Sequence, residues 1–253
     1  MSGHSKWATI KHKKGAADKA RGKLWAKLVR NIEVAAREGG GDPSANATLR
    51  SMVLKGKAEQ LPSDKITLAI KRGTGELKAD IQTESIMYEG YAPGGCALLV
   101  EVETDNRNRA AGDVRAAFSK NGGSIAEPGA VAWQFARRGV IMVPKKKSSG
   151  LLTEDELFLV AAEGGADDLI DQGDMFEVRC APTAVGEVCT ALTDAGIAFD
   201  SVDRPMVAEN LVPLGAEDAR KVLKMVDALD DLDDVAEIYV NFDISDEILA
   251  TLS

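Results

Sequence analysis

The sequence predicts an α+β protein of three domains. An N-terminal three-helix bundle precedes two ferredoxin-like α+β domains, and the third domain is inserted into the second. Up to about residue 75, apolar residues recur at helical intervals, whereas the remainder alternates short apolar strands with amphipathic helices. The charge changes at the same place. Residues 1–75 contain sixteen basic and six acidic side chains, and the other 178 residues contain fifteen and thirty-four. A positive bundle attached to a negative body is therefore expected.

The first predicted helix runs from about Asp18 to Glu38 and has two different faces. Its apolar face consists of residues spaced three and four apart, namely Leu24, Trp25, Leu28, Val29, Ile32, Ala35 and Ala36. Its opposite face carries five cations, namely Lys19, Lys23, Lys27, Arg30 and Arg37. The glycines after Glu38 supply the backbone freedom that commonly ends a helix. The cations form either a solvated face or a binding surface.

A basic segment precedes this helix and contains almost no apolar residues. Its cations are Lys6, Lys11, Lys13 and Lys14, together with His12, and Trp7 lies among them. An aromatic ring among lysines suits stacking on bases while the lysines neutralise phosphates. Trp7 could equally be a hydrophobic anchor that folds back onto the bundle. We expect the segment to order when it meets a partner.

Two shorter helices complete the predicted bundle. The first has an apolar stripe at Leu49, Met52 and Val53 and ends before Pro62. The second begins near Ser63 and ends at Gly73.

The central part of the chain reads as strands and helices in alternation. Strands are expected at Ile86–Tyr91 and Cys96–Thr104, a helix at Arg107–Lys120, and further strand material at Val131–Phe135. From Gly139 to about Val207 the order is strand, helix, two strands, helix, strand, which is typical of a ferredoxin-like unit.

The C-terminal part gives a helix at about Glu217–Asp230 and a strand at Glu237–Asp243. This helix and strand cannot form a sheet by themselves. The central series of strand, strand, helix and strand lacks one helix and one strand of a complete α+β domain. The pair therefore completes the central domain. The predicted domains are residues 1–77, residues 78–135 with 208–253, and residues 136–207.

Several long motifs carry a resemblance to a known family. The chain opens with GHSKWATIKHKKGAADKARGKLWAKL and continues with YEGYAPGG, TDNRNR, GAVAWQF and VAEIYVNFDIS. It resembles the YebC family over nearly its whole length. That family includes probable bacterial transcriptional regulators and a mitochondrial translational activator of cytochrome oxidase subunit one. The resemblance implies three domains and two forms of function: action on ribosomes slowed at consecutive prolines, or DNA-binding regulation of transcription.

A small anion site is predicted at the start of the helix that begins in TDNRNR. Asp105 or Asn106 can cap this helix, and Arg107 and Arg109 lie in its first turn, where free N–H groups already favour anions. Alternatively, Asp105, Asp113 or Glu103 pairs with these arginines. The full set of predicted nucleic-acid-binding residues is Lys6, Trp7, Lys11, His12, Lys13, Lys14, Lys19, Arg21, Lys23, Lys27, Arg30, Arg107 and Arg109.

The residue pattern does not favour an enzyme. Both histidines, His4 and His12, lie in the basic segment, and no phosphate-cradling glycine motif follows a strand. A carboxylate-only site remains an alternative, at Asp167, Asp168, Asp171 and Asp174 or at Asp227, Asp230, Asp231, Asp233 and Asp234. We expect no cofactor, no metal and reduced cysteines.

The sequence thus predicts a non-enzymatic regulator that binds ribosomal RNA or DNA, with the ribosome as a candidate partner. The lysine-rich surface suits phosphates more than base edges, which favours RNA. The rival hypotheses are a protein-interaction scaffold and a carboxylate-dependent nuclease. A cytoplasmic location is expected, because no secretory signal or membrane span is recognisable.

Overall fold

The structure is a computed structural model that describes residues 18–77, 84–147, 150–245, 247–248 and 251, with only the backbone described for residues 18–23 and 147. The chain divides into two compact units. The first unit comprises Met1–Arg30, Ala79–Ala136 and Val207–Ser253, and the second comprises Asn31–Lys78 and Arg137–Met206. The three-domain boundaries given above remain a prediction.

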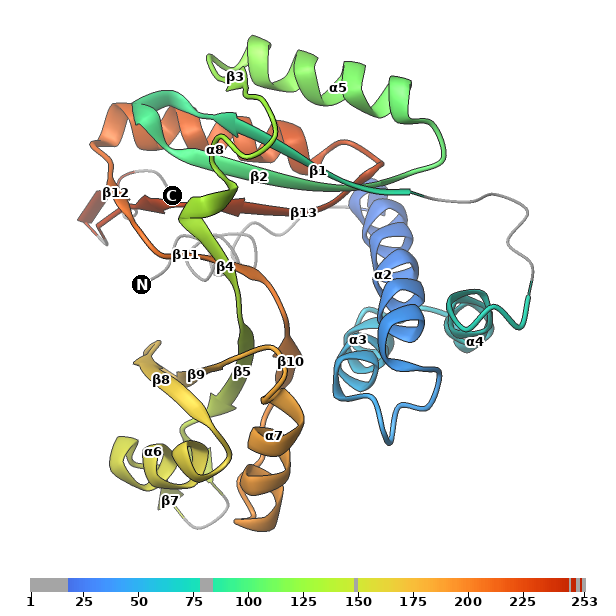
Figure 1. Cartoon of the computed structure of the whole chain (residues 1–253), viewed down its shortest axis with the longest axis vertical. Helices are drawn as coiled ribbons and strands as arrows, with labels where there is room; N and C mark the ends of the chain where they lie inside the picture. The colour runs from blue at the N-terminus through green and yellow to red at the C-terminus, as the bar shows by residue number, and fades with distance from the viewer. Residues whose placement is uncertain (1–17, 78–83, 148–149, 246, 249–250, 252–253) are drawn as a thin grey trace. The chain divides into compact units, whose positions relative to one another are not determined.

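Three helices form the N-terminal helical region (Figure 1), namely α2 (Asp18–Gly39), α3 (Ala47–Ala58) and α4 (Ser63–Gly73). The predicted apolar face of α2 is buried at Leu28, Ile32 and Ala36. Trp25, which we expected to be a core residue, is only half-buried. The helical pattern therefore gave the correct face but overestimated how deeply this ring lies.

Asn46 joins the end of α2 to the start of α3 in the second unit. Its buried side-chain amide donates to the carbonyl oxygens of Ala35 at 2.8 Å and Gly40 at 2.9 Å. Its side-chain oxygen accepts from the backbone N–H of Leu49 at 3.0 Å, and so caps α3. One side chain thus satisfies polar groups at both helix ends.

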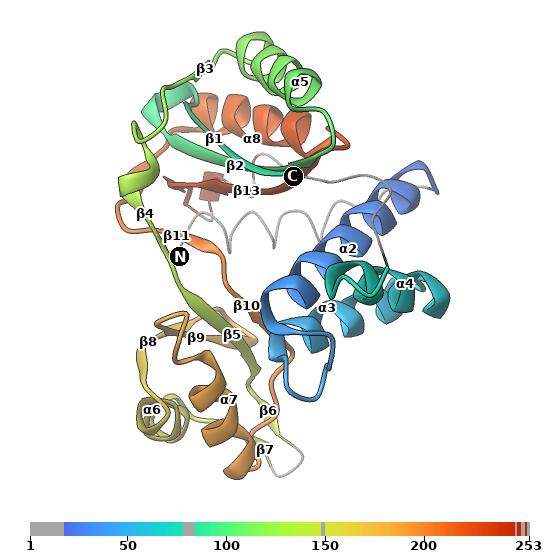
Figure 2. The ribbon, with the colours of Figure 1, turned by 45° about the vertical axis from the view of Figure 1, so that its right-hand side comes forward.

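A four-stranded sheet and two helices form the core of the first unit. The elements are β1 (Glu84–Tyr91), β2 (Ala97–Thr104), α5 (Arg107–Lys120), β3 (Ser124–Ile125), α8 (Ala216–Asp230) and β13 (Val235–Val240). The strand order is β13-β2-β1-β3, so the C-terminal helix and strand join the central elements. Both helices cover the same face of the sheet (Figures 1 and 2).

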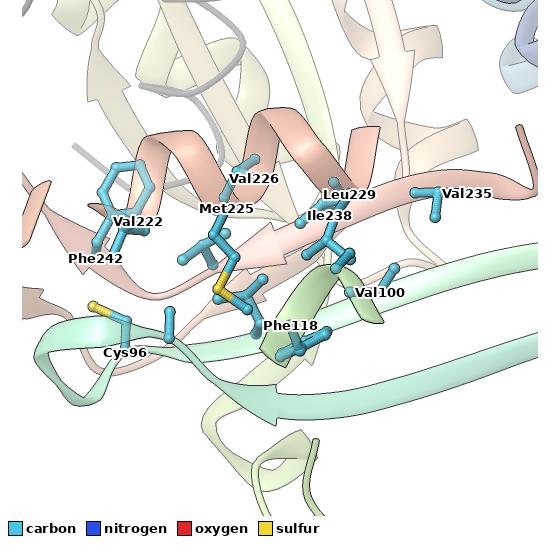
Figure 3. Packing of buried hydrophobic residues seen from close by; sticks show 14 of the residues in the cluster. Cys96, Val100, Phe118, Val222, Met225, Val226, Leu229, Val235, Ile238 and Phe242 are labelled. Carbon is cyan, nitrogen blue, oxygen red and sulfur yellow. The ribbon is translucent and has the colours of Figure 1, made fainter. Parts of the chain in front are cut away.

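The buried side chains between these helices and the sheet form one continuous apolar cluster (Figure 3). Its members include Leu98, Val100, Val114, Phe118, Val222, Met225, Leu229 and Ile238. Alternate residues of β2 point into it, as the period-two pattern of the sequence predicted.

The second unit contains the ferredoxin-like arrangement that the sequence predicted. Its elements are β5 (Gly139–Pro144), α6 (Glu154–Glu163), β8 (Ala166–Asp171), β9 (Met175–Cys180), α7 (Val185–Asp194) and β10 (Ser201–Asp203). The strand order is β10-β5-β9-β8, and all neighbours are antiparallel. Together with the sheet of the first unit, this confirms the α+β class.

The remaining elements are short. They are β4 (Phe135–Arg137), β6 (Lys146–Lys147), β7 (Gly150–Leu151), β11 (Met206–Ala208), β12 (Val212–Pro213), β14 (Phe242–Asp243) and the 3-10 turns η1 (Pro93–Gly95) and η2 (Ala132–Gln134). In the described part of the chain, no helix has the length and apolar character needed to cross a membrane.

The cysteines are buried and unpaired. Burial, aided by the nearby Asp218 carboxylate, raises the pKa of Cys96 to about 12. Burial likewise raises the pKa of Cys180 to about 11. Both side chains are therefore protonated thiols that pack as small apolar groups.

The prediction of a strand at Val131–Phe135 was wrong. The chain forms η2 there, and only Phe135 belongs to a strand. The cause is the buried carboxylate of Glu89 on β1, which accepts the backbone N–H groups of Gly129 at 2.5 Å, Val131 at 2.7 Å and Ala132 at 2.8 Å. Three N–H donors converging on one carboxylate fold this segment into a loop.

We expect Glu89→Gln to lower the free energy of unfolding by about 2 kcal/mol at neutral pH, because both oxygens of Glu89 accept N–H groups and the amide keeps only one acceptor oxygen, without the negative charge. Burial opposes ionisation of Glu89, but the three N–H donors outweigh it and lower its pKa. The stabilisation is therefore complete above the ordinary pKa of 4.5 and is lost as the pH falls through the lowered folded value. Denaturant unfolding of both proteins across this pH range checks the prediction, and a pH-independent difference between them would contradict it.

Candidate nucleic-acid interface

The thirteen predicted binding residues divide into three groups in the structure. Lys6, Trp7, Lys11, His12, Lys13 and Lys14 lie outside the described residues. Lys19, Arg21 and Lys23 lie on α2, in the stretch where only the backbone is described. The remaining four side chains are described, and they are Lys27, Arg30, Arg107 and Arg109.

Three of these four side chains converge on one acidic segment of the first unit, which we call the acidic turn and define as Asp230–Asp234. Lys27 donates to a side-chain oxygen of Asp230 at 2.6 Å and to its carbonyl oxygen at 2.8 Å. Asp230 is the last residue of α8, where unpaired carbonyl groups and the helix dipole already favour a cation. Lys27, predicted to project into solvent, therefore has a side chain that is only 12% exposed.

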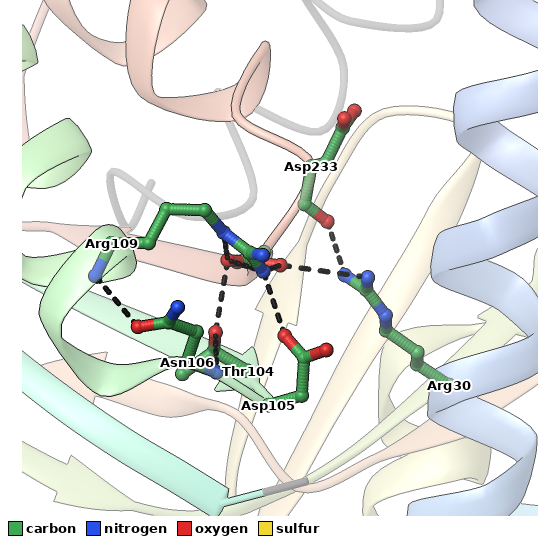
Figure 4. Close-up of polar contacts among 7 residues, drawn as sticks. Arg30, Thr104, Asp105, Asn106, Arg109 and Asp233 are labelled. Carbon is green, nitrogen blue, oxygen red and sulfur yellow. Dashed lines mark hydrogen bonds and ion pairs between the residues drawn. The ribbon is translucent and has the colours of Figure 1, made fainter. Parts of the chain in front are cut away.

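Asp234 binds the other two cations (Figure 4). Its carboxylate accepts from the Nη2 of Arg109 at 2.9 Å and lies 3.7 Å from the Nη2 of Arg30. Arg30 also donates to the carbonyl oxygen of Asp233. A single carboxylate thus brings a guanidinium from α2 close to one from the first turn of α5.

The start of α5 explains why Arg109 reaches this position. Asn106 caps the helix by accepting from the backbone N–H of Arg109 at 3.1 Å, while the hydroxyl of Thr104 accepts from the N–H of Asn106 at 3.0 Å. The same hydroxyl donates to Asp234 at 2.9 Å. Thr104 therefore binds both the capping residue Asn106 and the carboxylate of Asp234. These contacts orient Arg109 toward the acidic turn.

Of the carboxylates predicted as partners for the arginines, Asp105 pairs with Arg109 at 2.8 Å. Hydrogen bonds to Asp234 and Asp105 raise the pKa of Arg109, so this side chain stays cationic. Arg107 is exposed and has no hydrogen-bond or ion-pair partner among the described residues. The sequence predicted the local partner but missed Asp234, which lies 125 residues further along the chain.

A second group of cations lies on α3 and α4 in the second unit. Lys55 pairs with Asp203 at 3.0 Å. Lys57, Lys71 and Arg72 are exposed, and the structure shows no carboxylate partner for them among the residues it describes. These three side chains are available to an anionic partner.

The aspartates around β8 have basic partners. Asp167 pairs with Arg138 at 2.9 Å, and Asp171 pairs with Lys145 at 2.5 Å. The hydrogen bond from Lys145 lowers the pKa of Asp171. Across the described ranges, no three His, Cys, Asp or Glu side chains are grouped so as to hold a metal ion.

Comparison with known proteins covers almost the whole chain. Residues 5–76 match a family model described as the TACO1/YebC protein N-terminal domain, and residues 83–242 match one described as the TACO1/YebC second and third domain. The chain is 53% identical to the probable transcriptional regulatory protein DIP1378 of Corynebacterium diphtheriae, over 100% of this chain and 99% of that protein. It is also 53% identical to a probable transcriptional regulatory protein of Thermobifida fusca, over the full length of both. A crystal structure of a conserved hypothetical protein from Aquifex aeolicus superimposes with a TM-score of 0.80 at 40% identity, covering 96% of this chain and 98% of the other.

Proposed function

The chain belongs to the TACO1/YebC family, and from that premise we propose that it is a non-enzymatic regulator of gene expression that binds nucleic acid. Its target is RNA of the translating ribosome, where it eases synthesis through runs of proline. The observation that carries this proposal is the segregation of charge: residues 1–75 hold sixteen basic against six acidic side chains. A positive region of this kind attracts a phosphate backbone, even though the whole chain has a formal net charge of -9.

The geometry of the first unit supports phosphate binding by the described cations. Lys27 and Arg30 come from α2, whereas Arg109 comes from α5. Carboxylates hydrogen-bond to Lys27 and Arg109, and Arg30 binds the carbonyl oxygen of Asp233 with the carboxylate of Asp234 3.7 Å away. A phosphate group presents oxygens with similar charge and hydrogen-bonding geometry, so it fits donors that already bind carboxylates. Arg107 lies in the same helical turn as Arg109 and adds a further exposed guanidinium.

Lysine-rich contacts favour RNA over sequence-specific DNA in this proposal. Lysines contact phosphates, which position a protein without reading base edges. Short helices that carry lysines on their exposed faces match this mode better than a recognition helix that enters the major groove.

The alternative is a DNA-binding transcriptional regulator, and a specific observation favours it. Relatives with 53% identity over essentially their whole length are named probable transcriptional regulatory proteins. The same cations would then contact the phosphates of duplex DNA.

Crosslinking in cells followed by sequencing of the attached nucleic acid separates these functions. We expect ribosomal RNA to be enriched, and the protein to co-sediment with ribosomes. Enrichment of promoter DNA without ribosomal RNA would contradict the RNA proposal and support the alternative. Recovery of neither nucleic acid would overturn both and leave a protein-interaction scaffold as the better account.

A further inference from the structure

We propose that the acidic turn is an intramolecular competitor for the phosphates of the target. In the free protein it occupies Lys27, Arg30 and Arg109, and a nucleic acid must displace its carboxylates to bind these cations. This inference rests on the proposed function and concerns how the same interface is regulated.

The contacts show direct competition for the same donors. The Nζ of Lys27 makes two hydrogen bonds to Asp230, one to its carboxylate and one to its backbone. Arg109 directs both its Nε, at 3.3 Å, and its Nη2, at 2.9 Å, to Asp234. A phosphate that takes these donors has to replace the carboxylates or share the donors with them.

The turn resembles a short stretch of nucleic-acid backbone in its charge. The segment from Met225 to Val240 contains six acidic residues and no basic residue. The C-terminal end of α8 adds the negative end of a helix dipole beside Asp230. The turn is therefore a local source of negative potential held against the basic face of α2.

The pairs are suited to exchange with an external anion because they are partly solvated. One partner of each pair contacts water more than the other: Arg109 is 49% exposed against 13% for Asp234, and Asp230 is 27% exposed against 12% for Lys27. Ion pairs that contact water contribute modestly to stability, so a polyanion that offers several phosphates at once can displace them. The acidic turn therefore lowers the affinity of these cations for nucleic acid but can be displaced from them.

The test compares the full-length wild-type chain with the double variant D230N/D234N, which keeps the size of both side chains but removes their charge and replaces one acceptor oxygen of each by an NH2 donor. The control is E127Q/E209Q, which removes two exposed carboxylates from the same unit at positions with no described ion pair. The probe is a short fluorescein-labelled single-stranded RNA, with duplex DNA of the same sequence as a second probe. Binding is measured by fluorescence anisotropy, and thermal unfolding confirms that all three proteins are folded.

We expect D230N/D234N to bind the RNA about tenfold more tightly than the wild type, because two competing anions are removed from the cations themselves. The control should change the affinity by less than about twofold, since only the long-range field is altered. Equal tightening of both variants, or no tightening of D230N/D234N, would overturn the competitor while leaving the proposed function intact. If neither the wild type nor D230N/D234N binds either probe, the proposed function fails and the competitor fails with it.

Discussion

Replacing Lys27 and Arg30 together by glutamate is expected to weaken RNA binding roughly 100-fold at low salt. The change removes two cations from the basic face of α2 and places two anions where phosphates would lie. It also sets glutamates against Asp230 and Asp234, so the basic face loses its internal partners as well. We expect the free energy of unfolding to fall by about 2 kcal/mol or more, because Lys27 is only 12% exposed and each new glutamate faces a carboxylate, although the helix itself should persist.

The matched control is R115E/K120E, which makes the same change of charge on exposed positions of α5. This variant should bind within about threefold of the wild type, since only the long-range field is weakened. Fluorescence anisotropy and circular dichroism of the three proteins check both expectations. Equal losses in K27E/R30E and R115E/K120E would show that net charge, rather than the face of α2, governs binding.

The largest expected effect on stability comes from Gly90→Ala in β1. A methyl group at this position would lie 2.3 Å from a ring carbon of Phe118 and 2.6 Å from the backbone oxygen of Ser124. The Phe118 ring is fully buried. Ser124 belongs to β3, which pairs with β1 at Gly90 and Tyr91. Neither neighbour can retreat without disturbing the core, so we expect the unfolding free energy to fall by about 3 kcal/mol or more.

Gly112→Ala provides the control for this substitution. Gly112 lies within α5, and a methyl group there meets no neighbouring atom within 4 Å. Alanine is the better helix former, so this variant should gain about 0.5–1 kcal/mol. Denaturant unfolding of both variants and the wild type measures the two changes in the free energy of unfolding. An unchanged midpoint for Gly90→Ala would show that the packing around Phe118 is loose.

Local patterns in the sequence were sufficient to place most elements. The helix predicted at Arg107–Lys120 is α5 with the same bounds, because Asn106 is a strong cap and the apolar spacing is regular. The ferredoxin-like order from β5 to β10 follows from alternating periods that also need only local information. Distant constraints explain the failures. Nothing near Val131–Phe135 reveals that Glu89 folds this segment into a loop.

The candidate site shows the same division between local and distant information. Helical spacing put Lys27 and Arg30 on the side of α2 opposite its apolar stripe, but Lys27 is only 12% exposed and does not project into solvent. It could not show that Asp230 and Asp233, each 203 residues away along the chain, bind them. The sequence identified the acidic cluster only as a candidate carboxylate-only site, not as a partner for these cations. The pairing of Arg109 with Asp234 depends on the sheet that brings β13 beside β2.

The salt dependence of RNA affinity tests most directly whether these cations bind phosphates. For the full-length wild type, a plot of log affinity against log salt should fall steeply, with roughly 0.7 of slope for each single-stranded phosphate neutralised. Lys27, Arg30 and Arg109 together predict a slope magnitude of about 2 or more, and K27E/R30E should be shallower by about 1.4. A flat plot for the wild type, or an equal slope in K27E/R30E, would contradict the claim that this interface binds nucleic acid.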